Sequence, residues 1–471
     1  MDTDEQKHDV ITIVLTADNH LGATVPGHAS RKREVFRQRL RQAFQQATDF
    51  AIGQGVDLFV QVGDLFDNTH PDEEDRNFVA ARLAELKQAG VRAFALGGTH
   101  DTPTESRNQR GDILPAPHVS FARLGALHYF PPQPEDAPEQ EGALRTLRPV
   151  LLDVRGTLVG LCGLGSGSTG GQHEQSDPLA GVRIDDEIER AALPLLLLSA
   201  PIEGTHTAVS TGSQQVSQAS IAAQDAFRVI LAGYAHRYQR LTIGQAEVVI
   251  AGATQHVEFD EHEGSNSSDE PDGANGANNS ESSGRSADAP GFVFLGVAAD
   301  GIRWCRHIDI ESISMRRLVI STAELWPQGE HAGNAENAAP ASAASPTERI
   351  LEQLRPLCTQ ETIVQVRLAG ELSRQQYHQL ETNAIRRYGE AHAFAFLLDD
   401  SALTFTFDDD GGEPVSSRLS AAGFEERLSP REELIALADE WIAEAQDEQE
   451  KSALLATKEE LLSALWSTAK A

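Results

Sequence analysis

The sequence predicts an α/β protein, and two observations carry this prediction. Short apolar runs alternate with helical patterns through the first 310 residues, and glycines or polar turns end these runs. Beyond residue 310 the alternation gives way to a smaller α+β pattern and then to a helical C-terminus. The length of 471 residues is typical of two or three domains, and the 40% hydrophobic content is enough for a sizeable core.

The expected strands of the first domain are short, and several are rich in β-branched residues. They cover residues 10–15, 56–62, 91–96, 158–161, 195–198 and 227–231. Helical patterns over residues 35–52 and 76–89 separate the first three strands. Residues 260–290 contain almost no large apolar side chains and are expected to form a disordered surface loop. We assign residues 1–310 to this domain.

A smaller α+β domain is expected over residues 311–428. Its low-complexity segment, residues 327–347, is interpreted as a linker or long loop. The expected strands are residues 315–320, 362–368, 391–398 and 403–407, with helical segments around 348–357 and 373–386.

Residues 429–471 are expected to be helical. Ser429, Pro430 and Glu432 provide an N-cap, a first-turn proline and a capping-box acid. Apolar residues then recur at helical spacing, and the opposite face is heavily charged. A helix that packs on its own domain is the commoner explanation, and a helix that docks a partner is the alternative.

Composition excludes several classes of protein. The formal charge of −32, from 39 basic and 71 acidic residues, argues against a generic nucleic-acid coat but leaves room for a local basic strip. Cys162, Cys305 and Cys358 are far apart, so we expect neither a disulfide framework nor a thiolate zinc site. The polar N-terminus and the shortness of the apolar runs predict a cytoplasmic protein without a membrane segment.

Four of the expected strands end in carboxylates or imidazoles. These residues are Asp18 and His20, Asp64, His100 with Asp101, and His236. One such group would be ordinary surface chemistry. Because functional groups gather at the C-terminal ends of strands in α/β sheets, four in order predict a shared metal site.

These motifs resemble those of the calcineurin-like metallophosphoesterases, specifically the branch of SbcD-type nucleases that repair DNA double-strand breaks. The matching pieces are DNH at 18–20, GDLFDN at 63–68, GTHD at 98–101, LLLLSAPIEG at 195–204, GYAH at 233–236, GATQHVEFDE at 252–261 and GFVFLGV at 291–297. The resemblance covers about the first 310 residues. It implies a sandwich of two mixed β-sheets flanked by helices, and the smaller capping domain and C-terminal helical segment match only in layout.

The resemblance also implies a metal site with one intact half. The family's first metal takes ligands that match Asp18, His20, Asp64 and His236, and all four are present. Its second metal uses Asp64 and three positions that are degenerate here, namely Thr99, Ser199 and Tyr234. One divalent ion is therefore expected and a second is doubtful, with Mn²⁺ preferred and Fe²⁺ or Zn²⁺ as alternatives. Loss of the second ion is expected to weaken activity.

His100 and Asp101 are the catalytic residues that the resemblance implies. In the family this histidine, oriented by the aspartate, contacts the phosphate or protonates the leaving oxygen, a role that suits an imidazole near neutral pH. The alternative is structural persistence in a relative that has lost catalysis.

A basic segment covers residues 31–41, with six basic residues and one acid. Helical spacing places Arg33, Arg37 and Arg41 on one face, which predicts a DNA-binding strip. A solvated face whose arginines pair with acids elsewhere is an equally good explanation.

Two functions follow from these observations. The first is a metal-dependent phosphoesterase, expected to be a DNA nuclease of double-strand-break repair that uses a metal-bound water, with weakened activity. The second is a degenerate, non-catalytic subunit that binds DNA or scaffolds an SMC-like ATPase. By resemblance, the partners are DNA, with double-stranded ends preferred, and an SMC-like ATPase that docks on the C-terminal region, and a homodimer is a further option. A phosphatase of small phosphoesters is less favoured.

Overall fold

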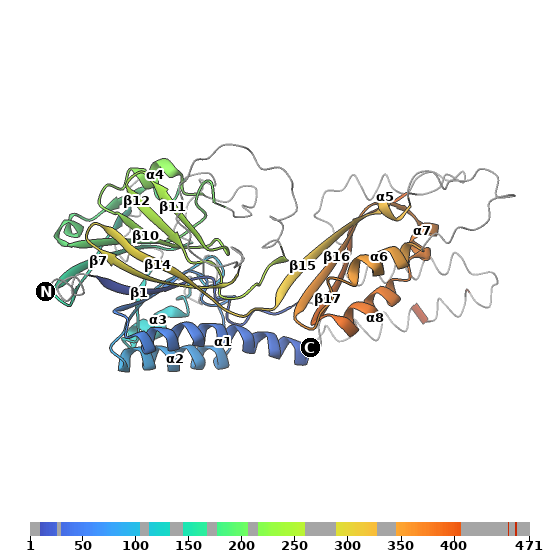
Figure 1. Ribbon diagram of the computed structural model, residues 1–471, viewed down its shortest axis with the longest axis horizontal. Coiled ribbons are helices and arrows are strands. Elements are labelled where there is room, and N and C mark those ends of the chain that lie inside the picture. Colours follow the sequence, from blue (N-terminus) through green and yellow to red (C-terminus); the bar gives the residue numbers. More distant parts are fainter. Residues whose placement is uncertain are drawn as a thin grey trace. The chain divides into compact units, whose positions relative to one another are not determined.

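The computed structural model describes residues 10–25, 30–103, 113–131, 145–166, 177–205, 215–259, 289–326 and 345–406, together with 451 and 457–458. Two six-stranded sheets dominate these residues (Figure 1). The first has the order β14-β13-β1-β2-β3-β4, and the second has the order β11-β12-β10-β9-β7-β6. Both contain parallel and antiparallel neighbours, so the predicted pair of mixed sheets is confirmed.

The first sheet is parallel at its centre. Its parallel strands are β1 (Ile11–Thr16), β2 (Leu58–Val62), β3 (Arg92–Leu96) and β4 (His128–Phe130). The hairpin of β13 (Gly291–Ala298) and β14 (Gly301–Asp309) adds antiparallel strands on the other side of β1. Continuous apolar runs form the central strands because both of their faces are covered.

The second sheet is built around three parallel strands. These are β7 (Thr157–Leu164), β9 (Leu193–Ser199) and β10 (Val229–Gly233). The remaining strands are β6 (Val150–Val154), β11 (Gln239–Ile243) and β12 (Ala246–Ile250). Shorter elements of this region are α3 (His118–Arg123), β5 (Arg145–Leu147), β8 (Val182–Ile184), η2 (Asp186–Arg190) and α4 (Gln218–Ala222).

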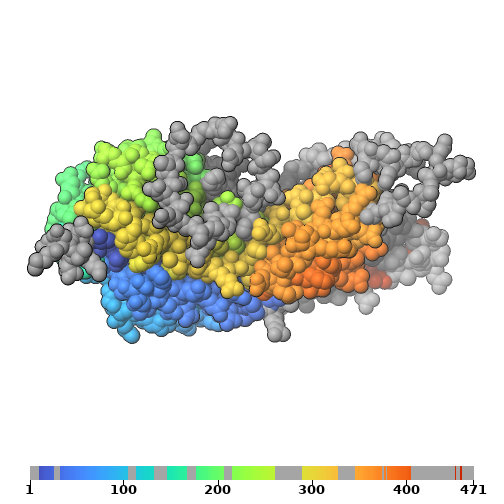
Figure 2. All heavy atoms as spheres, viewed as in Figure 1, coloured from blue at the N-terminus to red at the C-terminus, as the bar shows by residue number. Residues whose placement is uncertain are grey.

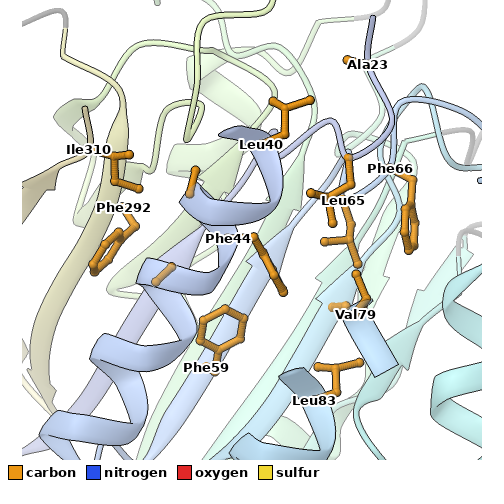
Figure 3. Packing of buried hydrophobic residues seen from close by; sticks show 14 of the residues in the cluster. Ala23, Leu40, Phe44, Phe59, Leu65, Phe66, Val79, Leu83, Phe292 and Ile310 are labelled. Atoms are coloured by element: carbon orange, nitrogen blue, oxygen red, sulfur yellow. The ribbon is translucent and has the colours of Figure 1, made fainter. Parts of the chain in front are cut away.

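Alternate residues of the central strands point into two different cores. Leu15 and Val60 join Leu197 and Leu231 in the core between the sheets. Phe59, one residue before Val60, faces the opposite way and packs at 5.9 Å, edge to face, on Phe44 of α1 (Ser30–Gln54) (Figure 3). The period of two along each strand therefore fixes which side chains face the helices.

Helices α1 and α2 (Glu73–Gln88) lie side by side on the outer face of the first sheet (Figure 1). In the space-filling view their side chains, in blue, form the surface next to the yellow residues of the β13–β14 hairpin (Figure 2). Asp72 caps α2 by accepting a hydrogen bond from the Asp75 N–H group.

A third sheet, in the order β15-β16-β17, carries the smaller α+β region. Its strands are β15 (Ser314–Ser321), β16 (Thr362–Ser373) and β17 (Ala395–Thr406). Its helices are α5 (Thr322–Leu325), α6 (Pro346–Leu354), α7 (Arg374–Gln379) and α8 (Thr382–His392). The predicted boundary at residue 310 falls between β14 and β15.

Two expectations for this region were wrong in detail. The predicted strands 391–398 and 403–407 are one strand, β17, because its polar residues, such as Ser401, are exposed and interrupt the apolar pattern without ending the strand. Residues 391 and 392 belong to α8. The expected linker also ends earlier than predicted, because Ser345 and Glu348 form a capping box that starts α6 at Pro346.

Several predicted segments cannot be compared with the structure. The expected loop is outside the described residues at 260–288, and so is the linker at 327–344. The helical segment 429–471 lies outside them as well, apart from three residues. Among the helices that the structure describes, none has the length and apolar composition needed to cross a membrane.

Candidate metal centre

The candidate ligands are carried by loops at the C-terminal ends of β1, β2, β3 and β10. The first two loops continue the pairing of their strands, since Asp18 N donates to Gly63 O and His20 N donates to Asp64 O, both at 3.0 Å. Tyr234 N, just after β10, donates to Asp18 Oδ2 at 3.1 Å. The parallel arrangement therefore brings segments more than 200 residues apart to one place, as the strand-end pattern predicts.

Within the described residues, two overlapping groups have the spacing of metal ligands. Asp18, His20 and His236 form the first group, and His20, Asp64 and His100 form the second. In each group one ligand atom per residue lies within 4.8 Å of the others. The structure thus gathers all four residues expected to bind the first metal, with His20 common to both groups, and it adds His100 to their neighbourhood.

His20 is oriented by a carboxylate that the sequence reasoning did not assign. Its Nδ1 lies 3.0 Å from Asp67 Oδ1, and its Nε2 lies 3.3 Å from His236 Nε2. A carboxylate at Nδ1 fixes the proton there, which leaves the Nε2 lone pair available. Two imidazole nitrogens that face each other at this distance suit a shared cation.

The backbone at the centre is strained. Asp18, His20 and Asp64 have φ values of 45°, 46° and 50°, and Tyr234 has 81°. Left-handed backbone is uncommon outside glycine and costs free energy, and such strain concentrates at functional sites. The residues Asp18, His20 and Asp64 are also almost completely buried, at 0%, 1% and 3% exposure. Buried, closely spaced carboxylates and imidazoles are costly without a compensating charge, and the donor set fits a divalent cation.

Asp64 receives two hydrogen bonds from the loop after β3. His100 N donates to Oδ1 at 2.7 Å, and Thr99 Oγ1 donates to Oδ2 at 3.3 Å. This approach requires glycine at position 98, because a Cβ there would lie 2.3 Å from Asp64 Cγ. The Thr99 hydroxyl is thus a hydrogen-bond donor to the carboxylate.

The other two positions that the sequence predicts to be degenerate, Ser199 and Tyr234, lie near the Asp64 loop. Ser199 is buried and packs so closely on Gly63 that a Cβ on that glycine would lie 2.2 Å from Ser199 Oγ. Burial raises the pKa of the Tyr234 phenol, and the negative charges of Asp64, Glu258 and Asp18 add to this effect. Tyr234 is therefore a neutral phenol at neutral pH, and a neutral phenol is a weak ligand.

The expected arrangement of His100 and Asp101 needs correction. His100 has a 42% exposed side chain, and its Nδ1 faces Asp67 O at 3.2 Å and Asp67 Oδ1 at 3.7 Å. Asp101 is completely buried and accepts hydrogen bonds from the Gly98 and Phe66 N–H groups. Asp67, and not Asp101, is therefore the carboxylate beside the His100 ring. Burial, together with the charge of Asp64, raises the pKa of Asp101.

The basic face of α1 is largely engaged within the chain. Arg37 and Arg41 both contact the fully buried Asp75 carboxylate, with nitrogen–oxygen distances of 2.5 and 2.6 Å. Arg37 also pairs with Asp72, and Arg41 pairs with Glu74. This is the alternative that the sequence left open for these two arginines. Arg33, one turn earlier, is exposed.

Comparisons with known proteins agree with the geometry. Residues 11–199 match the family model of the calcineurin-like phosphoesterases. The chain is 36% identical over 92 residues to the DNA double-strand break repair protein Mre11 of Methanosarcina mazei, covering 20% of this chain and 14% of that protein. It is 32% identical over 91 residues to Mre11 of Sulfurisphaera tokodaii, covering 19% and 22%. The matches thus span less than a quarter of either relative.

Among solved structures, a dimetal phosphatase from Danio rerio aligns with 64% of this chain and 100% of its own, at 11% identity and a TM-score of 0.34.

The family model begins at β1 and ends with β9, so it includes Asp18, His20, Asp64 and His100 and stops before His236. This chain therefore contains, over residues 11–199, a region that belongs to the calcineurin-like phosphoesterase family, within a fold whose two sheets continue to Asp309.

Proposed function

We propose that this chain is a metal-dependent phosphoesterase that hydrolyses phosphodiester bonds in DNA. The observation that carries the proposal is the convergence of Asp18, His20 and His236, whose ligand atoms lie within 4.8 Å of one another on loops from two different sheets. Membership of the domain in a phosphoesterase family supports the reaction class.

Asp18, His20, Asp64 and His236 would hold the cation. Two carboxylates and two imidazoles suit Mn²⁺ best, with Fe²⁺ or Zn²⁺ as alternatives. When bound, such an ion neutralises phosphate charge and lowers the pKa of a water molecule. We propose a single ion, because Thr99, Ser199 and Tyr234 offer only hydroxyl groups where a second ion would need stronger ligands.

His100 is the candidate for contact with the substrate. Its Nδ1 faces the Asp67 backbone carbonyl at 3.2 Å, which leaves Nε2 for a phosphate or a leaving oxygen. Its partial exposure permits that contact, whereas His20, at 1% exposure, is buried. An imidazole held in this way can pass a proton to a leaving oxygen.

DNA is the proposed substrate class, with double-stranded ends preferred. The similarity to proteins named for DNA double-strand break repair supports it, and the exposed Arg33 adds a positive charge on α1. We further propose three regions, residues 1–310, 311–428 and 429–471. The last would dock an SMC-like ATPase, and a homodimer is a further proposal.

A second function, a non-catalytic subunit that binds DNA or serves as a scaffold, is favoured by one observation. Thr99, one of the three positions expected to be degenerate, already donates from Oγ1 to the Asp64 carboxylate at 3.3 Å. Such a protein would bind one cation or none and would not cleave DNA.

The test counts Mn²⁺ in the purified full-length chain and measures Mn²⁺-dependent cleavage of double- and single-stranded DNA. We expect one ion per chain and cleavage above background. His236→Ala should lose the ion, and His100→Ala should keep it while cleavage falls at least a hundredfold. His392→Ala, on the exposed end of α8, is the matched control. One retained ion with no cleavage above His100→Ala would favour the non-catalytic subunit, and two ions would refute the single-ion proposal.

A further inference from the structure

Asp101 connects the two loops that carry Asp64 and His100. Its Oδ1 accepts a hydrogen bond from Gly98 N at 2.8 Å, within its own loop. Its Oδ2 accepts one from Phe66 N at 3.2 Å, in the loop after β2. Since His100 N donates in the opposite direction to Asp64 Oδ1 at 2.7 Å, each loop presents a carboxylate to the backbone of the other.

Asp101 also lies next to His118 of α3, a histidine that has no role in the proposed mechanism. His118, the first residue of α3, is completely buried, and its Nε2 lies 3.5 Å from Asp101 Oδ2. The ring stacks almost parallel on Tyr129, with centroids 4.9 Å apart and planes 9° apart, and it meets the edge of Phe66 at 6.1 Å. These contacts fix the ring in place.

A histidine at this apolar position costs desolvation free energy, because its ring nitrogens are buried. Neither ring nitrogen has a close hydrogen-bond partner among the described residues, and burial lowers the pKa of His118 to about 3, so the ring is neutral. A phenylalanine would fill the same space and stack on Tyr129 without a desolvation cost. What only the histidine supplies is a polar ring nitrogen, Nε2, which lies 3.5 Å from Asp101 Oδ2.

We propose that His118 and Asp101 form a buried brace that fixes the Asp64 loop against the His100 loop. Both are positioning residues, because both are completely buried and neither is among the candidate ligands. His118 supports Asp101 from α3, and Asp101 holds the Phe66 and Gly98 backbone groups that set the places of Asp64 and His100. The consequence for metal binding rests on the proposed function, whereas the mechanical coupling rests on the contacts alone.

The test measures hydrogen exchange in the metal-free, full-length chain. His118→Phe preserves the ring volume and the stack on Tyr129 but removes both ring nitrogens. Asp101→Asn replaces one carboxylate oxygen with an NH₂ group, which cannot accept a hydrogen bond from a backbone N–H group. Each variant should speed exchange about three- to tenfold in the peptides that contain residues 63–68 and 97–101, as expected for the loss of one polar contact at the buried Asp101 carboxylate. The Kd for Mn²⁺ should rise about tenfold.

The matched control is His128→Phe, on β4, a histidine whose ring packs against Phe94 and Phe130. It should leave exchange in both loops and Mn²⁺ affinity unchanged. His118→Gln, which restores an N–H donor, should recover part of the Mn²⁺ affinity, which a purely space-filling role would not. Should His118→Phe fail to fold by circular dichroism, Asp101→Asn alone decides the result.

Unchanged exchange in both loops would overturn the brace, as would an equal increase in His128→Phe or an increase spread evenly over the chain. If the wild-type chain binds no Mn²⁺ but exchange rises in the two loops, the proposed function fails and the brace stands. If Mn²⁺ binds and the variants change neither affinity nor exchange, the brace fails and the proposed function stands.

Discussion

His20 Nδ1 and Asp67 Oδ1 lie 3.0 Å apart, although 47 residues separate them along the chain. Asp67 also lies beside the other imidazole of the centre, with its carboxylate 3.7 Å from His100 Nδ1. One carboxylate thus faces the Nδ1 atoms of two histidines, whose rings meet edge to face with their centroids 4.7 Å apart.

Asp67→Asn should weaken divalent-cation binding without unfolding the protein. The amide removes the negative charge that fixes the His20 tautomer, so we expect the Kd for Mn²⁺ to rise about tenfold or more. Isothermal titration calorimetry measures this change. Asp309→Asn is the matched control, because Asp309 contacts the Nδ1 of another histidine, His307, at 2.9 Å. Equal Kd values for Asp67→Asn and the control would contradict the assigned role.

Gly98→Ala should damage the centre sterically. The new Cβ would lie 2.3 Å from Asp64 Cγ, so either the carboxylate or the loop must move. We expect the free energy of unfolding to fall by about 1–3 kcal/mol, as for overpacking in a core, together with weaker Mn²⁺ binding. Urea denaturation tests the first effect.

Gly53→Ala provides the contrast for Gly98→Ala. A Cβ at this position in α1 meets no atom within 4 Å, and alanine favours a helix over glycine by about 0.5–1 kcal/mol. The control should therefore be neutral or stabilising. A Gly98→Ala protein as stable as the wild type would show that the loop can make room for a Cβ beside Asp64.

Stability should depend on pH through His118. Burial lowers the pKa of His118 in the folded state to about 3, from an ordinary value of 6.5. Below pH 6.5, His118 is therefore protonated in the unfolded chain but stays neutral in the folded chain. The neutral His118 ring therefore leaves the free energy of unfolding undiminished above pH 6.5, and this free energy falls as the pH falls from 6.5 toward 3. Between pH 7 and pH 5, the wild type should lose about 2 kcal/mol more than His118→Phe, at about 1.4 kcal/mol per pH unit. Urea titrations of both proteins at the two pH values give this difference, and parallel curves would refute it.

Arg33→Ala and Arg41→Ala should separate DNA affinity from stability. Arg33 is exposed, so its removal should leave the free energy of unfolding within about 0.5 kcal/mol while reducing the salt slope of DNA binding by about one. Arg41 pairs with the buried Asp75, so its removal should destabilise the fold by about 3–5 kcal/mol. Fluorescence anisotropy at several salt concentrations and urea denaturation measure the two effects. An unchanged salt slope for Arg33→Ala would remove this residue from the proposed DNA strip.

Five strands of the first domain that the sequence predicted are buried along nearly their whole length, although β12 and β13, which are buried to a similar extent, were not predicted. β1, β2, β3, β9 and β10 have nearly all of their residues buried, and each was expected within three residues of its observed ends. β11 and β14 were missed because they alternate exposed and half-buried positions. Their stability depends on pairing with neighbours in the sheet, which a local pattern does not reveal.

The candidate ligands were predictable because strand ends are marked in the sequence, but their orientation was not. The GDLFDN motif contains Asp67 three residues after Asp64, and this spacing was the available signal for a second functional carboxylate. Asp101 is next to His100 in the chain, whereas Asp67 comes beside the His100 ring only when the loops after β2 and β3 fold against each other. The sequence therefore does not tell which carboxylate faces His100. The left-handed backbone of Asp18, His20 and Asp64 was equally invisible, since no glycine marks these positions.

The left-handed backbone at Tyr234 bears on attempts to engineer a two-ion enzyme from this chain. Histidine and asparagine tolerate such a conformation better than most residues, so a Tyr234→His replacement would meet little resistance from the main chain there. Ser199 offers the opposite case, because it is buried and already presses on Gly63, which leaves no space for an imidazole. A redesign would therefore have to enlarge the space around Ser199 before a histidine could be placed there, whereas the main chain at position 234 would accept one directly.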